Sequence, residues 1–388
     1  MIKRTLAAKL ISISKQFPAI ALTGPRQSGK TTLVRETFPK KPYVLLEDPD
    51  TREFAQKDPR GFLGQYPHGA ILDEIQRVPQ LFSYLQGILD KAKTPGLFIL
   101  TGSHNFLLME QITQSLAGRV ALLSLLPLSW QELSDSKNAF KNFEEHLFHG
   151  GYPKIYSDHL NPNDLYANYV RTYIDRDIRL IKNVHDLSIF HTFLKLCANR
   201  TGQLLNLSSL ADECGITHNT AKAWISVLES SYIIFLLRPH HNNLNKRLVK
   251  TPKLFFYDTG LASYLMGISD KHMLAQNPLK GNLFECFIIS EIIKSQFNKG
   301  NDPSIYFWQD KLGREIDCLI DNGPSSIPVE IKSGKTITDD YFKYITYWCS
   351  LSKYPAEKAR IVYGGNVSQQ RTTGFVQGWQ EFLSSLPL

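Results

Sequence analysis

Residues 24–31 read Gly-Pro-Arg-Gln-Ser-Gly-Lys-Thr and match the pattern G-x-x-x-x-G-K-[ST] in full. Glycines at these positions allow backbone N–H groups to wrap phosphate oxygens, and a helix that starts here adds a favourable dipole. Lys30 is expected to bridge the β- and γ-phosphates of a nucleotide, and Thr31 is expected to ligate Mg²⁺. The sequence therefore predicts a site for ATP and Mg²⁺ formed by Gly24, Pro25, Arg26, Gln27, Ser28, Gly29, Lys30, Thr31 and Thr32.

Two acidic residues extend this predicted site. Residues 70–74 read Ala-Ile-Leu-Asp-Glu, an apolar strand that ends in two carboxylates. We expect Asp73 to hold the hydration shell of Mg²⁺ and Glu74 to polarise the attacking water. A further apolar segment is followed by Thr101 and Ser103, which could sense the γ-phosphate or belong to an ordinary polar turn.

Arg119 ends the segment Ser-Leu-Ala-Gly-Arg and admits two interpretations. It could reach the nucleotide of a neighbouring subunit and stabilise the charge that develops during hydrolysis. It could equally form an ion pair on the surface.

A second group of carboxylates lies towards the C-terminus. Residues 314–320 alternate like a half-buried strand, the turn sequence Asp-Asn-Gly-Pro follows, and 327–332 predict the returning strand. In a hairpin symmetric about 322–325, Asp317 faces Glu330 across the two strands. Adjacent carboxylates repel each other, so this arrangement predicts a cation between them.

A divalent metal, Mg²⁺ or Mn²⁺, would satisfy these acids and could activate water against a phosphodiester. In the same register Glu315 faces Lys332, which shares a strand face with Glu330 and could orient the nucleophile. Glu285 lies on an apolar helical segment, where a lone carboxylate is unfavourable, and is a further candidate ligand. A salt bridge between Glu330 and Lys332 is the alternative interpretation.

Residues 207–215 and 218–230 have the pattern of a helix–turn–helix, and a loop at 238–253 with five basic residues and no acid follows it. The exposed face of the second helix and the loop would suit phosphate contacts that carry little sequence information. The same region could instead be a protein-interaction module. The predicted DNA contacts are Asn219, Thr220, Lys222, Lys246, Arg247 and Lys250.

The elements that position these residues form an α/β pattern at the start of the chain. Apolar strands alternate there with helical stretches, which predicts a largely parallel sheet. The five expected strands are 19–22, 43–46, 70–72, 97–100 and 120–125. We expect four domains, an α/β core with the phosphate-binding site at 1–135, a mainly helical region at 136–195, a winged helix at 196–266 and a C-terminal domain of mixed helix and strand at 267–388.

Composition agrees with a folded protein that binds polyanions. The chain of 388 residues is 43% hydrophobic and carries a formal net charge of +8. Five widely spaced cysteines argue against a disulfide framework and indicate a reducing compartment. No apolar run approaches the roughly 20 residues of a membrane-spanning helix. We therefore expect a cytoplasmic location and no membrane partner.

Five motifs resemble, in the same order, a family of bacterial and archaeal AAA+-type ATPases whose C-terminal region was long described only as a domain of unknown function. They lie at 24–32, 72–76, 100–103, 115–119 and 150–153, the last reading Gly-Gly-Tyr-Pro. The resemblance covers nearly the whole chain. It implies an α/β P-loop NTPase core of AAA+ type, a helical lid, a winged helix and a C-terminal α/β restriction-endonuclease-like domain of PD-(D/E)xK type.

The same resemblance implies a homo-oligomer, with a hexameric ring as one form, in which Arg119 completes a neighbour's site. In the nuclease-like fold an earlier helix often adds a glutamate, a place that Glu285 would take. The favoured hypothesis is a Mg²⁺-dependent ATPase that couples hydrolysis to binding or remodelling DNA, for example as a branched-DNA motor. A nucleotide-dependent switch or protein-remodelling module, and an ATP-regulated metal-dependent nuclease, remain alternatives.

Overall fold

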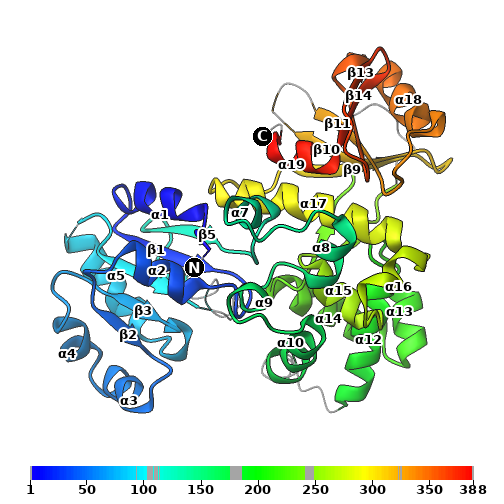
Figure 1. The fold of residues 1–388 in the computed structure, drawn as a ribbon. Coiled ribbons are helices and arrows are strands. Elements are labelled where there is room, and N and C mark those ends of the chain that lie inside the picture. The colour runs from blue at the N-terminus through cyan, green and yellow to red at the C-terminus, as the bar shows by residue number, and fades with distance from the viewer. Residues whose placement is uncertain are drawn as a thin grey trace. The chain divides into compact units, whose positions relative to one another are not determined.

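Five apolar segments near the N-terminus form one parallel sheet in the computed structural model (Figure 1). Their order in the sheet is β2-β3-β4-β1-β5, so the chain crosses between strands through helices. The predicted parallel α/β core is confirmed. The strands are β1 (Ala19–Thr23), β2 (Tyr43–Leu45), β3 (Ile71–Asp73), β4 (Phe98–Thr101) and β5 (Val120–Ser124).

The structure describes residues 2–92, 94–102, 108, 112, 114–174, 186–240, 249–321, 323 and 326–386. They divide into two compact units. Unit 1 comprises Met1–Leu128, Ser230–Tyr232 and Phe297–Asn301, and unit 2 comprises Ser129–Glu229, Ile233–Gln296 and Asp302–Leu388.

The central strands β1, β3 and β4 of the unit 1 sheet are buried on both faces, because neighbouring residues of a strand enter different cores, whereas Leu45 of β2 and Leu122 of β5 are exposed at the two edges. Ala19 and Ala21 of β1 pack with α3 (Pro49–Lys57), α4 (Pro59–Gly64) and α5 (Leu81–Ala92). Ile20 and Leu22 pack on the other face with α1 (Leu6–Ser14) and α2 (Lys30–Thr37). A strand covered on both sides is apolar at successive positions, which is why these segments read as continuous apolar runs.

The first part of unit 2 contains a series of helices and a small three-stranded sheet. Three strands pair in the antiparallel order β6-β8-β7 beside two consecutive helices joined by a turn. In chain order the elements are α7 (Trp130–Asp135), α8 (Phe143–His149), α9 (Pro153–Ser157), α10 (Pro162–Tyr169), the π-helical turn η2 (Val170–Ile174), α12 (Leu187–Asn199), β6 (Gln203–Leu204), α13 (Leu207–Cys214), α14 (His218–Ser230), β7 (Ile234–Leu237) and β8 (Lys253–Phe256).

Helix α14 packs through aromatic side chains against α12. Trp224 of α14 is buried, and its ring lies edge-on to Phe190 and Phe193 of α12 at centroid distances of 5.2 Å each. Gly215 adopts φ +63° after α13 and lets the chain turn into the next helix.

The rest of unit 2 is a six-stranded mixed sheet preceded by a long helix. The strand order is β13-β14-β12-β11-β10-β9. The elements are α15 (Thr259–Leu265), α16 (Lys271–Gln276), α17 (Lys280–Asn298), β9 (Ile305–Gln309), β10 (Glu315–Asp321), β11 (Ser326–Lys332), α18 (Lys343–Ser352), β12 (Arg360–Tyr363), β13 (Gln369–Arg371), β14 (Gly374–Gly378) and α19 (Trp379–Ser384). Helix α17 ends in the segment that unit 1 includes.

Strands β10 and β11 form the predicted hairpin in the predicted register. Cys318 pairs with Val329 and Asp321 pairs with Ser326, which is the symmetry expected about 322–325. Between Ile316 and Leu319 the pairing of β10 with β9 shifts register, so the strand is irregular on its other edge.

Candidate nucleotide site and carboxylate cluster

The predicted phosphate-binding loop connects β1 to α2 in unit 1, and its glycines are required by its backbone. Gly24 adopts φ +136°, and a Cβ atom there would lie 2.1 Å from the carbonyl oxygen of Leu125. Gly29 adopts φ +92° and is the N-cap of α2. Side chains rarely adopt such angles, so the loop keeps its path only with glycine at these two positions.

Lys30 lies inside this loop. Its side chain is 7% exposed, and its Nζ donates hydrogen bonds to the carbonyl oxygens of Gly24 at 2.9 Å and Pro25 at 2.8 Å. Ser28 is fully buried, and its Oγ has no hydrogen-bond partner among the described residues. The loop therefore presents an ammonium group and an unsatisfied hydroxyl beside backbone N–H groups, which suits phosphate oxygens.

Asp73 is the centre of the polar network next to the loop. Thr31 Oγ1 donates to its Oδ2 at 2.8 Å, and Tyr43 Oη donates to the same oxygen at 2.7 Å. Thr101 Oγ1 and the backbone N of Glu74 donate to Oδ1. The structure thus brings together three residues that the sequence assigns to this site, Thr31, Asp73 and Thr101.

Tyr43 is a site residue that the sequence analysis missed. It opens β2, which lies next to β3 in the sheet. Burial and the hydrogen bond to Asp73 raise the pKa of Tyr43 above its ordinary value, so it stays a neutral donor. The only signal in the sequence is a polar aromatic residue at the start of a predicted strand.

Glu74 follows Asp73 in the left-handed region, at φ +56°. Its Oε2 accepts a hydrogen bond from Nε2 of Gln76, a buried side chain that the sequence analysis did not select. This contact fixes the direction of the carboxylate that is predicted to polarise water. Gly102 lies against the same amide, because a Cβ there would be 2.3 Å from Oε1 of Gln76.

Arg119 forms a bidentate ion pair with Asp90 of α5. Nε lies 2.5 Å from Oδ1 and Nη2 lies 3.0 Å from Oδ2. This is the surface pair that the sequence left open, and a role at a neighbour's nucleotide would require Arg119 to leave Asp90. Ser103, the other candidate sensor, lies outside the described residues.

The donor set of this site fits a magnesium nucleotide. Mg²⁺ prefers oxygen ligands and is usually held by one or two protein oxygens together with water and phosphate. Thr31 Oγ1 and the Asp73 carboxylate supply such oxygens within hydrogen-bond distance of each other. With ATP bound, Thr31 and Asp73 would hold the ion, Lys30 would neutralise phosphate charge, and Glu74 would orient water.

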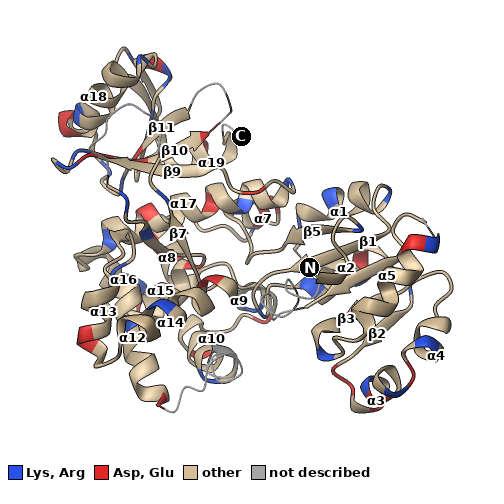
Figure 2. Ribbon diagram, turned by 180° about the vertical axis from the view of Figure 1, so that it is seen from behind, with Lys and Arg blue, Asp and Glu red and all other residues tan. Residues whose placement is uncertain are grey.

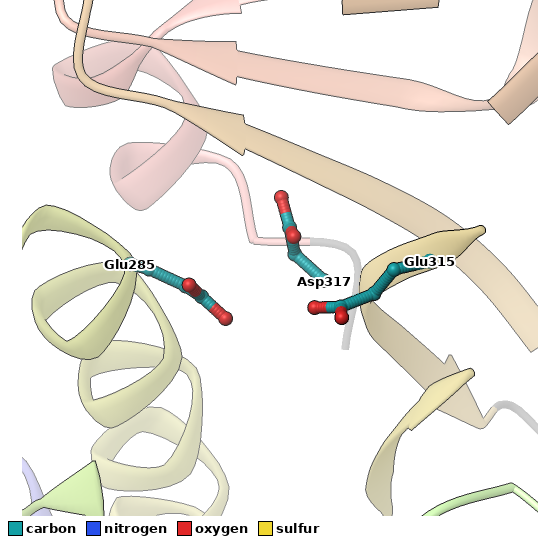
Figure 3. A group of neighbouring side chains, drawn as sticks. All are labelled: Glu285, Glu315 and Asp317. Carbon is teal, nitrogen blue, oxygen red and sulfur yellow. The ribbon is translucent and has the colours of Figure 1, made fainter. Parts of the chain in front are cut away.

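A cluster of three carboxylates occurs in unit 2. Oxygens of Glu285 on α17 and of Glu315 and Asp317 on β10 lie within 4.8 Å of one another, and Figure 3 shows the three side chains converging from the helix and the strand. The sequence predicts Glu285, Asp317 and Glu330 as ligands; Glu285 and Asp317 belong to this group, and Glu330 does not. Glu315, two residues before Asp317 on the same strand face, is the additional member.

Glu330 and Lys332 lie beside this cluster. Lys332 Nζ is 2.6 Å from Glu330 Oε1 and 3.6 Å from Asp317 Oδ2. Burial, followed by the charge of Asp317, raises the pKa of Glu330 to about 8. The salt bridge between Glu330 and Lys332 that the sequence offered as an alternative is present.

Lys253 of β8 is the residue of this cluster that the sequence analysis placed elsewhere. Its Nζ lies 3.1 Å from Glu285 Oε1 and also contacts Glu315 Oε1. Lys253 is 4% exposed, so it does not contribute to the exposed basic surface that the composition of 238–253 suggests. A composition count treats every lysine near a loop as solvated, whereas Lys253 already belongs to the buried strand.

The other predicted DNA contacts lie on α14 and after the loop. Asn219, Lys222 and Lys250 are exposed, and Thr220 is half-buried. Thr217 Oγ1 accepts a hydrogen bond from the backbone N–H of Thr220 at 3.1 Å. It therefore caps one of the free N–H groups in the first turn of α14. Lys246 and Arg247 lie outside the described residues. Figure 2 shows lysine and arginine on both units, among acidic residues.

Tyr232 connects the end of α14 to the nucleotide-binding core within unit 1. It has φ +56°, which is uncommon for a tyrosine, and its Oη lies 2.9 Å from Thr23 Oγ1 and 2.8 Å from Ser124 Oγ. Thr23 immediately precedes Gly24. The residues that follow α14 therefore contact the strand end from which the phosphate-binding loop begins.

Three family models match separate parts of the chain. Residues 16–134 match an AAA domain, and residues 140–272 and 280–382 each match a domain of unknown function. An uncharacterized protein of Mycobacterium tuberculosis is 28% identical over 339 residues, covering 86% of this chain and 74% of its own length. An uncharacterized protein of Methanocaldococcus jannaschii is 23% identical over 272 residues, covering 64% of this chain and 57% of its own length.

Solved structures show weaker likeness. A Walker-type ATPase of Pyrococcus abyssi is 17% identical with a TM-score of 0.44, covering 68% of this chain and 96% of that chain. RuvB of Thermotoga maritima is 14% identical with a TM-score of 0.32, covering 61% of this chain and 88% of that chain. Among the described residues, no helix has the length and apolar character needed to cross a membrane. The AAA-domain match, together with the loop geometry, supports a nucleotide-hydrolysing ATPase of AAA type at the N-terminal end of the chain.

Proposed function

We propose that this protein is a Mg²⁺-dependent ATPase that couples ATP hydrolysis to the binding or remodelling of DNA, mostly without regard to sequence. The ATPase part rests on one observation, the hydrogen bond between Thr31 and Asp73. It lies next to the phosphate-binding loop, whose carbonyl oxygens accept hydrogen bonds from Lys30. These are the oxygens and the cation that phosphoryl transfer needs, because catalysis in such sites is mainly positioning and charge stabilisation.

The DNA part rests on the region from α12 to β8. Its elements follow one another in the order of a winged helix, with α14 in the place of a recognition helix. The exposed face of α14 offers Asn219 and Lys222, and Lys250 is exposed just before β8. Few basic groups on that helix favour phosphate contacts over base readout.

Tyr232 supports coupling between the two activities. A shift at the end of α14 would reach Thr23 and the start of the phosphate-binding loop through the Tyr232 hydroxyl. Tyr232→Phe removes this hydroxyl and keeps the ring. We expect it to reduce stimulation of the ATPase by DNA and to leave the rate without DNA unchanged.

The steady-state ATPase rate with Mg²⁺, measured alone and with single-stranded, duplex and branched DNA, tests the proposal. Lys30→Ala is the blank. Stimulation by one form of DNA supports the coupled ATPase and names its substrate. Hydrolysis that depends on Lys30 but responds to no DNA favours the alternative, a nucleotide-dependent switch or protein-remodelling module. A Lys30→Ala rate equal to wild type would overturn the site itself.

DNA contact has its own signature in the salt dependence of binding. Each phosphate contact contributes about one unit to the slope of log K against log salt. Lys222→Ala and Lys250→Ala should each reduce the slope by about this amount. The matched control is Lys57→Ala, which removes an exposed lysine of unit 1. Equal slopes in all variants would exclude α14 and its neighbouring loop as the DNA surface.

The proposal includes a homo-oligomer in which Arg119 acts on a neighbour's nucleotide, and a cytoplasmic location, with which five buried free cysteines agree. We further infer that α17 and the six-stranded sheet form a PD-(D/E)xK nuclease-like domain. Convergence of Glu285 with Asp317 favours a metal-dependent nuclease as a second candidate function. Cleavage that requires Mg²⁺ or Mn²⁺ and is lost in both Asp317→Ala and Glu330→Ala would establish it.

A further inference from the structure

The carboxylate cluster of unit 2 already contains a cation supplied by the chain. Three acids converge from α17 and β10, and like charges at this separation repel strongly unless a positive charge lies between them. The Lys253 ammonium contacts two of the three acids, Glu285 and Glu315. It therefore provides the charge that a metal ion would otherwise provide.

The position of this ammonium is fixed by the fold. Lys253 pairs with Leu204 of β6 on one side and with Leu237 of β7 on the other. Its Nζ lies 5.7 Å from the centroid of the Phe307 ring on β9. Strand pairing fixes the backbone of Lys253, and burial with two carboxylate contacts holds its side chain at the cluster, so a metal ion has to compete with an ammonium group that is already in place.

The charges around the cluster favour an ammonium ion at Lys253. Burial alone would lower the pKa of Lys253, but attraction to Glu285, Glu315 and Asp317 outweighs burial and raises it. On the other side of the cluster, Lys332 neutralises Glu330 and lies near Asp317. These two lysines face the acids from different strands.

One buried acceptor beside the cluster remains unsatisfied. Glu330 is 3% exposed, and its Oε2 has no hydrogen-bond partner among the described residues, although its Oε1 contacts Lys332. A buried carboxylate oxygen without a donor is unfavourable, and a metal ion is one group that would satisfy it. Beside the cluster, therefore, one acceptor next to the Lys332 ammonium group is open to a further ligand.

We propose that Lys253 is a built-in competitor for a divalent cation, and that Mg²⁺ or Mn²⁺ binds to Glu285, Glu315 and Asp317 only when the Lys253 ammonium is withdrawn. The segment that contains β8 therefore controls the metal content of the cluster. This inference is independent of the proposed ATPase and deepens the second candidate function, the metal-dependent nuclease; its test measures metal binding and not cleavage, so the failure of one can be told from the failure of the other.

Mn²⁺ binding to the full chain without nucleotide, followed by electron paramagnetic resonance of the free ion, tests the inference. Lys253→Met should bind Mn²⁺ at least about tenfold more tightly than wild type, since one full charge leaves the site. Adding Asp317→Asn to Lys253→Met should remove this binding. Lys294→Met is the matched control, because Lys294 is a buried lysine paired with Glu291 on α17 at 2.7 Å, and it should create no such site.

Two results would overturn the inference. One is wild-type binding as tight as that of Lys253→Met and equally sensitive to Asp317→Asn, which would mean that Lys253 does not compete. The other is a folded Lys253→Met without a site that depends on Asp317.

If Lys253→Met folds poorly, a second variant can be tested by measuring its unfolding temperature with and without Mn²⁺. Lys253→Met/Glu315→Gln removes one charge of each sign and retains Glu285 and Asp317. A rise of its unfolding temperature with Mn²⁺, absent in wild type, supports the inference, and no rise contradicts it.

Discussion

Thr31 Oγ1 donates a 2.8 Å hydrogen bond to Oδ2 of Asp73, although β1 and β3 are separated in the sheet by β4. The contact is possible because the loop after β1 carries Thr31 onto the first turn of α2, over the end of the sheet. Tyr43 on β2 and Thr101 on β4 hold the same carboxylate from the neighbouring strands. Asp73 is therefore oriented before any ion arrives, which is the arrangement that a metal site needs.

Glu74→Gln should separate nucleotide binding from hydrolysis. The amide keeps the size of the side chain but cannot accept a proton from water, so we expect kcat to fall by about 10² to 10⁴. The affinity for ATP should stay near that of wild type, because Lys30, Thr31 and Asp73 are unchanged. Equilibrium binding of a fluorescent ATP analogue and steady-state hydrolysis measure the two effects.

The control for this change is Glu47→Gln, which alters an exposed glutamate paired with Arg77 in the same unit. It should leave both quantities unchanged. Hydrolysis by Glu74→Gln at the wild-type rate would show that another group activates the water.

Arg119→Ala should abolish hydrolysis in the assembled protein without affecting the fold of unit 1. The ion pair with Asp90 is exposed, and exposed pairs contribute little to stability. If Arg119 completes a neighbour's site, its loss should lower kcat by a factor on the order of 10³. Mixing Arg119→Ala with Lys30→Ala should restore some activity, because some interfaces then join an intact arginine to an intact loop.

Asp90→Ala breaks the same pair and leaves the arginine in place, so it serves as the matched control. Active Asp90→Ala with inactive Arg119→Ala supports a role in trans. Equal losses in both variants would assign the pair a structural role only.

The sequence allowed the local parts of this structure to be predicted. The strands of unit 1 were recognisable as apolar runs, three of which are buried on both faces, and the hairpin register followed from the period of two and the turn at 321–324. Glycines of the loop after β1 were likewise identified by pattern. These features depend on neighbours in sequence.

Contacts between distant segments could not be predicted in this way. Lys253 meets carboxylates 32 and 62 positions later in the chain, and its basic neighbours suggested a solvated loop. Tyr43 lies at the nucleotide site because β2 pairs with β3, and Gln76 lies there because the chain turns back after β3. A single sequence predicts neither of these arrangements. Tyr43 therefore lies outside every motif, and Gln76 ends the motif at 72–76 without a role assigned to it.

Gly150→Ala should destabilise unit 2 strongly. Gly150 has φ +68°, and a Cβ there would lie 2.2 Å from Tyr166 Oη and 2.4 Å from Asp258 Oδ1. Tyr166 Oη donates a hydrogen bond to Asp258 Oδ1 at 2.7 Å, and the backbone N–H of Gly151 donates one to Asp258 Oδ2 at 2.6 Å. Breaking this buried network should lower the free energy of unfolding by about 2 kcal/mol or more.

Tryptophan fluorescence during urea unfolding measures this effect selectively, because all five tryptophans of the chain belong to unit 2. The control is Gly87→Ala in α5 of unit 1, where an added Cβ has nothing within 4 Å. Gly87→Ala should leave the tryptophan transition unmoved. A Gly150→Ala transition at the wild-type urea concentration would contradict the proposed clash.

His146 should make unit 2 less stable as the pH falls. The imidazole is 3% exposed, its Nε2 lies 3.0 Å from both the backbone N and O of Phe140, and its ring stacks on Phe287. Burial lowers the pKa of His146 to about 4, and the nearby charges of His149 and Lys294 act in the same direction. The folded protein therefore keeps this ring neutral at a pH where the unfolded chain protonates it.

The sign follows from proton linkage. Between the unfolded pKa near 6.5 and the folded pKa near 4, the unfolded state binds more protons, so the free energy of unfolding decreases as pH decreases. From pH 7 to pH 5 this group should remove about 2 kcal/mol of stability from unit 2. Urea unfolding followed by tryptophan fluorescence at both pH values measures the loss.

His146→Phe should abolish the part of the pH dependence that comes from His146. The control His272→Phe, at a histidine whose side chain is 85% exposed, should retain it. An unchanged pH dependence in His146→Phe would assign the acid sensitivity of unit 2 to other groups.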